Sequence, residues 1–209
     1  MAVLLSGGGT SLENLFKEIE AGLPAEVVCV LASKKSAFGL QRAEQHDVPA
    51  FAIPRREYAD IHAFNDALHE VLDRHEPDLV CLLGFLSPFE LRGRYAGKTL
   101  NVHPALIPAF SGKGFYGHHV HEAVLKAGVK LTGATVHFAS DEYDDGPILL
   151  QGTVPVEDGD DADRLAARVQ ALERKLLPEA IRLIADGRVQ IEAGRVRIRP
   201  SRSESTLPS

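Results

Sequence analysis

Short, almost uninterrupted apolar runs alternate with amphipathic helical patterns through the first hundred residues of this chain. The apolar runs are Ala2–Leu5, Val27–Leu31, Ala50–Ile53, Leu79–Leu83 and Thr99–Val102, and the helical patterns are Ser11–Ala21, Gly39–His46 and Tyr58–His75. Such runs are typical of parallel strands that helices cover on both faces. The alternation therefore predicts an α/β fold, with a Rossmann-like, mostly parallel sheet and helices on both of its faces.

The second half of the chain follows a different pattern. Two strand candidates, Leu131–Phe138 and Ile148–Val154, are separated by an acidic turn, which indicates a hairpin or a long connection. The amphipathic stretch Asp161–Ala185 predicts a long helix that Pro178 kinks or divides. We therefore expect a C-terminal antiparallel addition to the parallel sheet.

The end of the chain shows a short ribbon pattern. Val189–Ile191 and Val196–Ile198 flank Ala193-Gly194, which indicates two short strands joined by a turn. Residues 200–209 show no apolar pattern, so we expect a flexible tail there. A length of 209 residues is enough for one core, and we expect a single domain over residues 1–199.

The charge balance limits the classes of partner. The chain carries 23 Lys and Arg residues and 29 Asp and Glu residues, so its formal net charge is −6. A surface that coats nucleic acid needs clustered basic residues, so we expect no nucleic-acid partner, although a local phosphate site stays open. No apolar run approaches the ~20 residues of a membrane span, and no basic region of a signal peptide precedes Ala2–Leu5. We therefore expect no membrane partner and a cytoplasmic location.

The two cysteines, Cys29 and Cys81, each lie within an apolar run. Two cysteines cannot form a disulfide scaffold, and free cysteine is among the most buried residue types. We predict two buried thiols, which agrees with a reducing compartment.

The first predicted strand leads into a glycine-rich loop, Ser6-Gly7-Gly8-Gly9-Thr10-Ser11, and then into a helix. Glycines let backbone N–H groups approach an anion, and a helix N-terminus attracts negative charge. A tight turn, in which Thr10 or Ser11 caps the helix, is the alternative, but three glycines exceed what a turn needs. We therefore favour a phosphate site.

The loop does not fit the two common nucleotide-binding motifs. The dinucleotide fingerprint requires a glycine where Leu12 stands and an acidic residue where the chain has Ala32-Ser33-Lys34-Lys35. A P-loop requires Gly-Lys-Ser/Thr, which does not follow here. The expected ligand therefore carries a phosphate of the mononucleotide type and is not NAD.

The segment Asn101-Val102-His103-Pro104 lies at the C-terminal end of a predicted strand, where open α/β sheets bind their ligands. Asn101 and His103 point to the same face of such a strand. Asparagine can donate a hydrogen bond to a developing oxyanion, and histidine can transfer a proton near neutral pH. A capping asparagine and a packed histidine are the alternative at this point.

Four of the five residues in Asp141-Glu142-Tyr143-Asp144-Asp145 carry a carboxylate. A calcium loop does not fit, because Tyr143 and Gly152 occupy positions that need oxygen ligands. The segment is either a solvated turn, or one of its aspartates folds inward to a histidine and stabilises the imidazolium.

The remaining polar residues have simpler interpretations. The segment His118-His119-Val120-His121 indicates a solvent-facing helix start rather than a zinc site, which would need further ligands. His137 lies within a strand, where core packing is the default interpretation. Gln170 and Glu173, three residues apart on one helix face, are typical of an exposed pair.

Taken together, these segments resemble the folate-dependent formyltransferase family. The segments that carry the resemblance are Ser6–Leu12, Pro77–Phe85, Asn101–Pro104, Gly133–Phe138 and Asp141–Gln151. They cover roughly residues 1–190, and Asn-x-His-Pro followed by Asp-x-Gly-Pro is the most specific part.

The resemblance implies transfer of a formyl group from the co-substrate 10-formyltetrahydrofolate to the amine of 5-phosphoribosylglycinamide, in purine biosynthesis and without a metal. It implies that Asn101 stabilises the tetrahedral oxyanion, that His103 is the general acid, and that Asp144 keeps His103 protonated and oriented. The residues that would bind the phosphoribosyl substrate are Gly9, Thr10, Ser11, Leu12, Glu13, Gln170 and Glu173. Those that would bind the folate are Phe85, Leu86, Ser87, Asn101, Ser140, Asp141, Glu142, Tyr143 and Asp144.

Other activities of the family stay open. A formyltetrahydrofolate hydrolase uses the same three catalytic residue types but typically has an N-terminal regulatory domain, and a methionyl-tRNA formyltransferase usually has a C-terminal domain; we expect neither. A formyltransferase that acts on a sugar nucleotide has a suitable length. From a different class, a non-catalytic nucleotide-binding module has no use for three converging catalytic residues. We therefore expect small-molecule partners, with the chain a monomer or homodimer.

Overall fold

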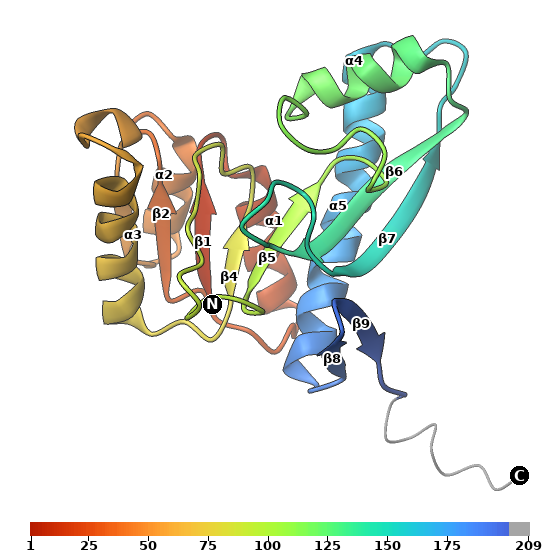
Figure 1. Cartoon of the computed structure of the whole chain (residues 1–209). Helices are drawn as coiled ribbons and strands as arrows, with labels where there is room; N and C mark the ends of the chain where they lie inside the picture. The colour runs from red at the N-terminus through yellow and green to blue at the C-terminus, as the bar shows by residue number, and fades with distance from the viewer. Residues whose placement is uncertain (201–209) are drawn as a thin grey trace, which may run out of the picture.

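The computed structural model describes residues 1–200, so the predicted tail lies, apart from Pro200, outside the described residues. Figure 1 shows a twisted central sheet flanked by helices, followed by a small C-terminal ribbon. The strands are β1 (Ala2–Leu5), β2 (Cys29–Ala32), β3 (Ala50–Ala52), β4 (Val80–Leu82), β5 (Thr99–His103), β6 (Leu131–Phe138), β7 (Ile148–Pro155), β8 (Val189–Glu192) and β9 (Arg195–Ile198). The helices are α1 (Thr10–Glu20), α2 (Phe38–Gln45), α3 (Ile61–His75), α4 (His118–Ala127) and α5 (Ala162–Ala185), with a 3-10 helix at Arg55–Glu57.

One seven-stranded sheet, in the order β3-β2-β1-β4-β5-β6-β7, forms the centre of the molecule. Strands β1 to β5 are parallel, whereas β6 is antiparallel to β5 and β7 is antiparallel to β6. The predicted fold, a mostly parallel sheet with a C-terminal antiparallel addition, is confirmed. The strand order reverses at β1, which has β2 on one side and β4 on the other. Ligands of open α/β sheets bind at such a switch point, beyond the C-terminal ends of the strands.

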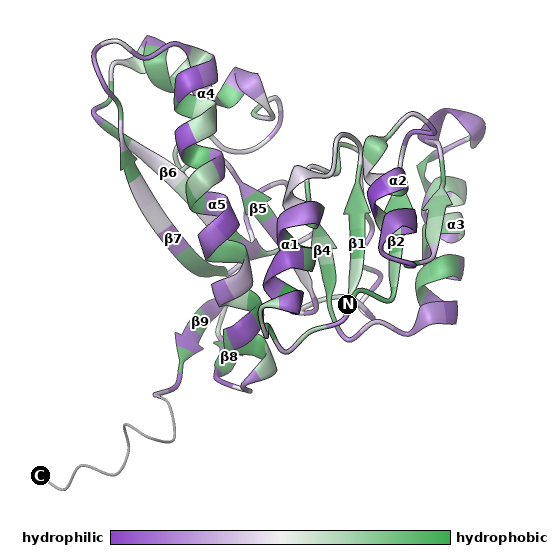
Figure 2. Cartoon of the chain, turned by 180° about the vertical axis from the view of Figure 1, so that it is seen from behind, coloured by the Kyte–Doolittle hydropathy of each residue, from purple (hydrophilic) through white to green (hydrophobic). Residues whose placement is uncertain are grey.

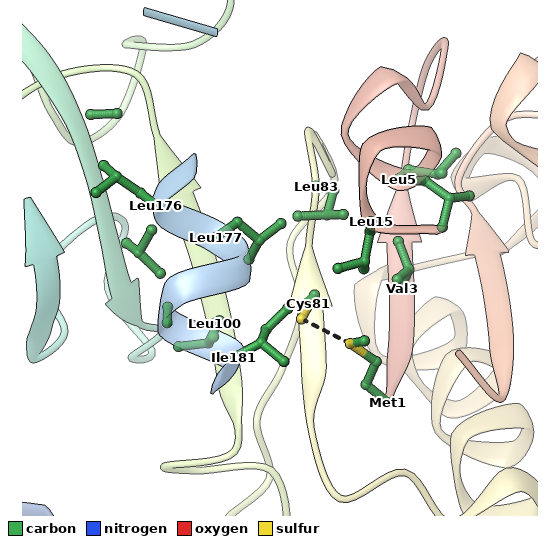
Figure 3. Packing of buried hydrophobic residues seen from close by; sticks show 14 of the residues in the cluster. Met1, Val3, Leu5, Leu15, Cys81, Leu83, Leu100, Leu176, Leu177 and Ile181 are labelled. Carbon is green, nitrogen blue, oxygen red and sulfur yellow. Dashed lines mark hydrogen bonds between the residues drawn. The ribbon is translucent and has the colours of Figure 1, made fainter. Parts of the chain in front are cut away.

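Alternate residues of β1 enter two separate cores. Val3 and Leu5 pack with side chains of α1 and α5, whereas Ala2 and Leu4 pack with side chains of α3. Figure 3 shows the first core, with the leucines of α1 and α5 directed at the strands. Figure 2 shows apolar strands between helices whose outer surfaces are largely hydrophilic. Because both faces of the sheet are covered, its inner strands are apolar at successive positions.

Both cysteines are free and buried, as the sequence predicts. Cys81 lies in the first core, with its Sγ 4.0 Å from the Sδ of Met1 (Figure 3), and Cys29 lies in the second core. Burial raises the pKa of Cys29 to about 11 and that of Cys81 to about 12, so neither thiol is reactive at neutral pH.

One helix boundary follows from a capping side chain. Asp60 accepts a hydrogen bond from the backbone N–H of Ala63 at 2.8 Å, so α3 begins at Ile61 and not at the predicted Tyr58. Of the two alternatives for Pro178, division of the long helix is wrong, because α5 is continuous, whereas a kink stays a prediction. Pro178 is buried with the apolar face of α5, and this packing outweighs the backbone hydrogen bond that proline cannot make.

The antiparallel half lies close against α5. A Cβ on Gly152 of β7 would lie 2.8 Å from a terminal methyl of Leu172, so a larger residue here would require Leu172 to shift. The predicted terminal ribbon is confirmed as the antiparallel pair β8 and β9. Within residues 1–200, none of the helices has the length and apolar character that crossing a membrane requires.

Candidate functional site

The loops at the C-terminal ends of β1, β4 and β5 lie together and line one cavity of about 270 Å³. The cavity is lined from the strand side by Gly7, Gly8, Gly9, Thr10, Ser11, Leu83, Gly84, Val102 and Pro104, and from the helix side by Gly117, His118, His121, Ala166, Gln170 and Glu173. A second cavity, of about 390 Å³, lies beside Glu26–Val28 at the opposite edge of the sheet, and no predicted site residue lines it. The smaller cavity is therefore the candidate phosphate site, because five of the predicted substrate residues line it, Gly9, Thr10, Ser11, Gln170 and Glu173, whereas Asn101, His103 and Asp144 do not.

The glycine loop presents unpaired backbone donors to this cavity. Gly9 has a φ of 70°, which favours glycine, and it is the residue before the first turn of α1. The capping alternative is wrong, because no side chain caps this helix. The N–H groups of the first turn of a helix have no intrahelical partner, and these groups lie beside the cavity at the positive end of the α1 dipole. The loop is therefore suited to hold an anion.

Two of the residues predicted at this loop do not line the cavity. The side chain of Leu12 is fully buried in the first core. The carboxylate of Glu13 accepts a hydrogen bond from Arg42 at 2.8 Å. The bond from Arg42 lowers the pKa of Glu13 in spite of the opposing effect of burial, so this carboxyl is ionised at neutral pH. Leu12 can offer a ligand only its backbone groups, and the N–H of Glu13 already donates to the carbonyl of Gly9 at 3.0 Å.

The structure brings Asn101, His103 and Asp144 into one cluster. Nδ2 of Asn101 donates to Oδ1 of Asp144 at 3.2 Å, and Nδ1 of His103 lies 3.4 Å from Oδ2 of Asp144. Asn101 and His103 both belong to β5, whereas Asp144 lies in the loop between β6 and β7. The inward aspartate that the sequence left open is therefore Asp144, and β5 pairs with β6 to bring it there.

His137 belongs to this cluster, so its interpretation as a packed core histidine is incomplete. His137 is opposite Asn101 in the pairing of β5 with β6. Its Nδ1 lies 3.0 Å from the Phe138 carbonyl and so carries a proton, which leaves Nε2 to accept from Nδ2 of Asn101 at 3.1 Å. The side chain of His137 is only 2% exposed. The strand register that aligns His137 with Asn101 is the signal that could have identified it.

Both ring nitrogens of His103 are engaged. Nε2 donates to the carbonyl of Phe110 at 2.8 Å, while Nδ1 faces the carboxylate of Asp144. Burial lowers the pKa of His103, and Asp144 and the Phe110 carbonyl oppose this effect without overcoming it. Burial acts to raise the pKa of Asp144, but its contacts with His137, His103 and the Gly112 amide lower that pKa below its ordinary value. An ionised Asp144 therefore faces a histidine whose charged form is disfavoured by burial and only partly restored by Asp144 and the Phe110 carbonyl.

The loop that carries Asp144 is largely exposed. Asp141, Glu142 and Tyr143 are exposed, and the hydroxyl of Ser140 donates to the carbonyl of Glu142 at 2.9 Å. Asp144 has a φ of 55°, which is uncommon for a residue with a side chain, and Oδ2 accepts from the Gly112 amide at 2.9 Å. The solvated-turn interpretation therefore fits the flanking acids but not Asp144.

Two residues that the sequence patterns do not single out hold the segment after His103. The hydroxyl of Thr135 donates to the carbonyl of Ala105 at 2.7 Å and accepts from the amide of Ile107 at 3.1 Å. Gln151 reaches the same hydroxyl and the carbonyl of Ile107, both at 3.0 Å. These bonds tie the segment after β5 to β6 and β7, and so fix the backbone from which His103 projects.

The predicted folate residues after β4 lie outside the cavity of the glycine loop. The amide of Leu86 donates to the hydroxyl of Ser6 at 2.9 Å, and the ring of Phe85 stacks on Phe64 with centroids 6.4 Å apart. Leu86 is 57% exposed, and Ser87 is partly exposed. This segment is therefore placed beside the start of the glycine loop, with an apolar side chain open to solvent.

Two residues on the helix side of the cavity, Glu173 and His121, differ from their predicted exposed positions. Glu173 is not a plain exposed residue, because it is partly buried, and burial raises its pKa to about 7. The solvent-facing interpretation of the helix start is wrong for His121, which is buried and whose Nδ1 has no hydrogen-bond partner. Burial also lowers the pKa of His121. Both residues line the cavity, as Gln170 does.

Within residues 1–200, no group of three or more His, Cys, Asp and Glu side chains has a geometry that could hold a metal ion. The expectation that the chain needs no metal stays a prediction.

Comparison with known proteins gives a consistent result. A family profile described as formyl transferase matches residues 1–181. Phosphoribosylglycinamide formyltransferase of Escherichia coli is 36% identical over 195 residues, which cover 91% of this chain and 89% of that protein. The trifunctional purine biosynthetic protein adenosine-3 of Gallus gallus is 39% identical over 94% of this chain, and the match covers only 19% of that protein. The chain thus spans about a fifth of the trifunctional relatives.

Solved structures agree with this similarity. Glycinamide ribonucleotide transformylase 1 from Symbiobacterium toebii has a TM-score of 0.90 and 39% identity, with coverage of 95% of this chain and 93% of that one. A formyltetrahydrofolate deformylase from Pseudomonas syringae has a TM-score of 0.85 but only 22% identity, and this chain covers 65% of it. The second likeness supports the fold alone.

Proposed function

This chain belongs to the formyl transferase family, and from that premise we propose that it transfers a formyl group from 10-formyltetrahydrofolate to the amine of 5-phosphoribosylglycinamide. The observation that carries the proposal is that a glycine loop with unpaired backbone donors follows β1, and the Asn101–His103–Asp144 cluster lies at the end of β5, at the same edge of the parallel sheet. The first suits a phosphate, and the second suits acyl transfer. An enzyme that formylates a phosphorylated amine needs both.

The glycine loop would anchor the phosphate of the ribonucleotide. Gly9, Thr10 and Ser11 would donate backbone hydrogen bonds, and the α1 dipole would add attraction. Gln170 and Glu173 face the same cavity from α5, where they would bind the ribose hydroxyls. With the phosphate held at the end of β1, the substrate amine would point along the sheet edge toward β5.

The Asn101–His103–Asp144 cluster would then stabilise the oxyanion and supply the proton that the formyl transfer needs. The substrate amine attacks the formyl carbon, and the carbonyl oxygen becomes an oxyanion that Nδ2 of Asn101 stabilises by donating a hydrogen bond. His103 gives a proton to the departing folate nitrogen as the carbon–nitrogen bond breaks, and the proton lost by the amine restores the acid. Asp144 favours the charged, correctly oriented form of His103 against the effect of burial.

The contacts within the cluster must change before it can act. The donors of Asn101 are directed at Asp144 and His137, and both nitrogens of His103 have partners. A folate that docks against residues 85–87 and 140–144 would replace some of these contacts, because the exposed acidic loop carries Asp144. Phe85, Leu86, Ser87, Ser140, Asp141, Glu142 and Tyr143 are therefore proposed as folate contacts, together with Asn101 and Asp144. A cytoplasmic location and a monomeric or dimeric state stay predictions.

Folate product formation, followed by absorbance with 5-phosphoribosylglycinamide present or omitted, tests this function. We expect turnover only when the ribonucleotide is present, together with a formylated product that mass spectrometry identifies. Equal turnover without the ribonucleotide would instead indicate a formyltetrahydrofolate hydrolase. Turnover only with an amino sugar nucleotide would indicate the other alternative.

A further inference from the structure

The rear of the glycine loop is built by α2, which has no part in the function proposed so far. The amide of Gly39 donates to the carbonyl of Gly7 at 3.2 Å, and Nε of Arg42 donates to the carbonyl of Gly8 at 2.9 Å. A Cβ on Gly9 would lie 2.7 Å from Cα of Gly39, so the loop and α2 are in direct backbone contact. Two consecutive carbonyls of the loop are therefore directed at α2.

Because the peptide bond is planar, the direction of each loop carbonyl also fixes the direction of the next N–H. In a trans peptide the carbonyl of one residue and the N–H of the next point in opposite directions. When the Gly8 carbonyl is held toward Arg42, the Gly9 N–H points away from α2. Gly8 and Gly9 both line the cavity, whereas Arg42 does not. The bond from Arg42 therefore holds a backbone donor in the orientation that an anion in the cavity needs.

The Arg42 guanidinium also pairs with the Glu13 carboxylate, whose negative charge would otherwise repel an anion. Glu13 lies in the first turn of α1, two residues after Ser11, which lines the cavity. Its Oε2 lies 2.8 Å from Nη1 of Arg42, and the two side chains are only 26% and 23% exposed. Lys17 is a weaker partner, 3.7 Å from Oε1 and 68% exposed. Without Arg42, a partly shielded carboxylate would stand near the phosphate with little compensation.

We infer that Arg42 is a positioning residue of the phosphate site, through its bond to the Gly8 carbonyl and its pairing with Glu13. The ring of Phe38, whose centroid lies 5.1 Å from the guanidinium carbon, supports Arg42 from the α2 side. This inference rests on the proposed function only in the identity of the phosphate compound. The orientation of the loop and the neutralised carboxylate concern any phosphate.

Binding of inorganic phosphate to the full chain, measured by calorimetric titration, tests the inference without the need for activity. We expect Arg42→Met to weaken phosphate binding roughly tenfold and Arg42→Lys, which keeps the charge but loses the bond to Gly8, about threefold. Glu13→Gln should bind phosphate as tightly as the wild type or more tightly. The double variant Arg42→Met/Glu13→Gln should regain about half of the loss on a logarithmic scale, because the uncompensated charge is gone.

A matched control separates this role from general damage. Arg74→Met removes an arginine of α3 that pairs with Glu70 at 3.0 Å, away from the cavity, and should leave phosphate binding unchanged. In the transfer assay, Arg42→Met should raise KM for the ribonucleotide with kcat and the folate KM almost unchanged, which a merely loosened fold would not do. Phosphate affinity of Arg42→Met within twofold of the wild type would overturn the inference. If Arg42→Met does not fold, unchanged affinity in Arg42→Lys would overturn it instead.

Failure of the positioning role of Arg42 can be distinguished from failure of the proposed function. If the chain binds phosphate in the Arg42-dependent way but does not formylate the ribonucleotide, the substrate assignment is wrong and the positioning role stands. If it formylates the ribonucleotide with Arg42→Met as well as with the wild type, the positioning role is wrong and the function stands.

Discussion

The two ends of the site differ in how ready they are for a ligand. At the glycine loop, the carbonyls of Gly7 and Gly8 are held by α2, and no side chain occupies the donors of the first α1 turn. At the catalytic cluster, the donors of Asn101 and His103 are taken up by other groups of the protein. Under the proposed function, the first end is therefore arranged for phosphate in advance, whereas the second would exchange internal contacts for folate and amine.

The difference follows from the elements that carry each end. The glycine loop lies between a buried strand and a helix with a packed face, and α2 binds the carbonyls of Gly7 and Gly8. Asp144 is carried by an exposed loop and has a left-handed backbone conformation. Loops of this kind close around substrates in many enzymes. Under the proposed function, phosphate binding would thus lie on a loop that α2 holds, and the chemistry on a cluster that an exposed loop completes. Variants that affect only one end test this division.

The largest effect is expected from His103→Ala at the catalytic end. Its contribution is made mainly in the transition state, so kcat should fall by about 10²–10⁴-fold while KM for the ribonucleotide changes little. Steady-state kinetics measure both constants, with His62→Ala as a control because His62 is an exposed histidine outside both ends. A near-normal kcat in His103→Ala would remove this residue from the chemistry.

Asp144→Asn should have the next largest effect. Burial lowers the pKa of His103 and Asp144 opposes it, so without this carboxylate the pKa falls further. The protonated form then disappears at lower pH, and the basic limb of the kcat profile should move to lower pH, with a maximum reduced by about 10–100-fold. Phosphate affinity should stay as in the wild type. An unmoved basic limb would show that Asp144 does not act on His103.

Gly9→Ala tests the preformed end. The new Cβ would lie 2.7 Å from Cα of Gly39 and the φ of 70° is unfavourable, so we expect a loss of about 1–3 kcal/mol in unfolding free energy and weaker phosphate binding. Gly8→Ala is the matched variant, because a Cβ there meets nothing within 4 Å. It should keep the stability of the wild type in thermal and denaturant unfolding. Equal stability of the two variants would mean that the loop is not held against α2.

Glu173→Gln should give the smallest change in activity but a measurable change in stability. The folded pKa of about 7 exceeds the unfolded value of 4.5, so the folded wild type holds a proton that the unfolded chain releases between these values. The wild type should therefore lose up to about 3 kcal/mol of stability as pH rises from 4.5 to 7, and Glu173→Gln should not. Denaturant unfolding at several pH values measures this, and parallel curves for the two proteins would contradict it.

Much of the fold could be predicted because apolar periodicity reports on burial. The runs at Ala2–Leu5 and Thr99–Val102 correspond to β1 and β5 because both faces of the sheet are covered. The pairing of β5 with β6 was less predictable, since register depends on contacts between distant segments. For that reason Asn101 and His103 could be singled out from their own strand, whereas His137 could not be joined to them. Arg42 could not be singled out, because its role depends on a carbonyl 34 residues earlier.

The separation of the two ends is tested most directly by calorimetric titration of 5-phosphoribosylglycinamide into the chain in the absence of folate. The wild type and His103→Ala should bind the ribonucleotide with dissociation constants within about threefold of each other, and added tetrahydrofolate should change neither by more than that. The Arg42→Met variant should bind it roughly tenfold more weakly under the same conditions. Ribonucleotide binding that is detectable only after folate is added, or that is lost in His103→Ala, would contradict a preformed phosphate end.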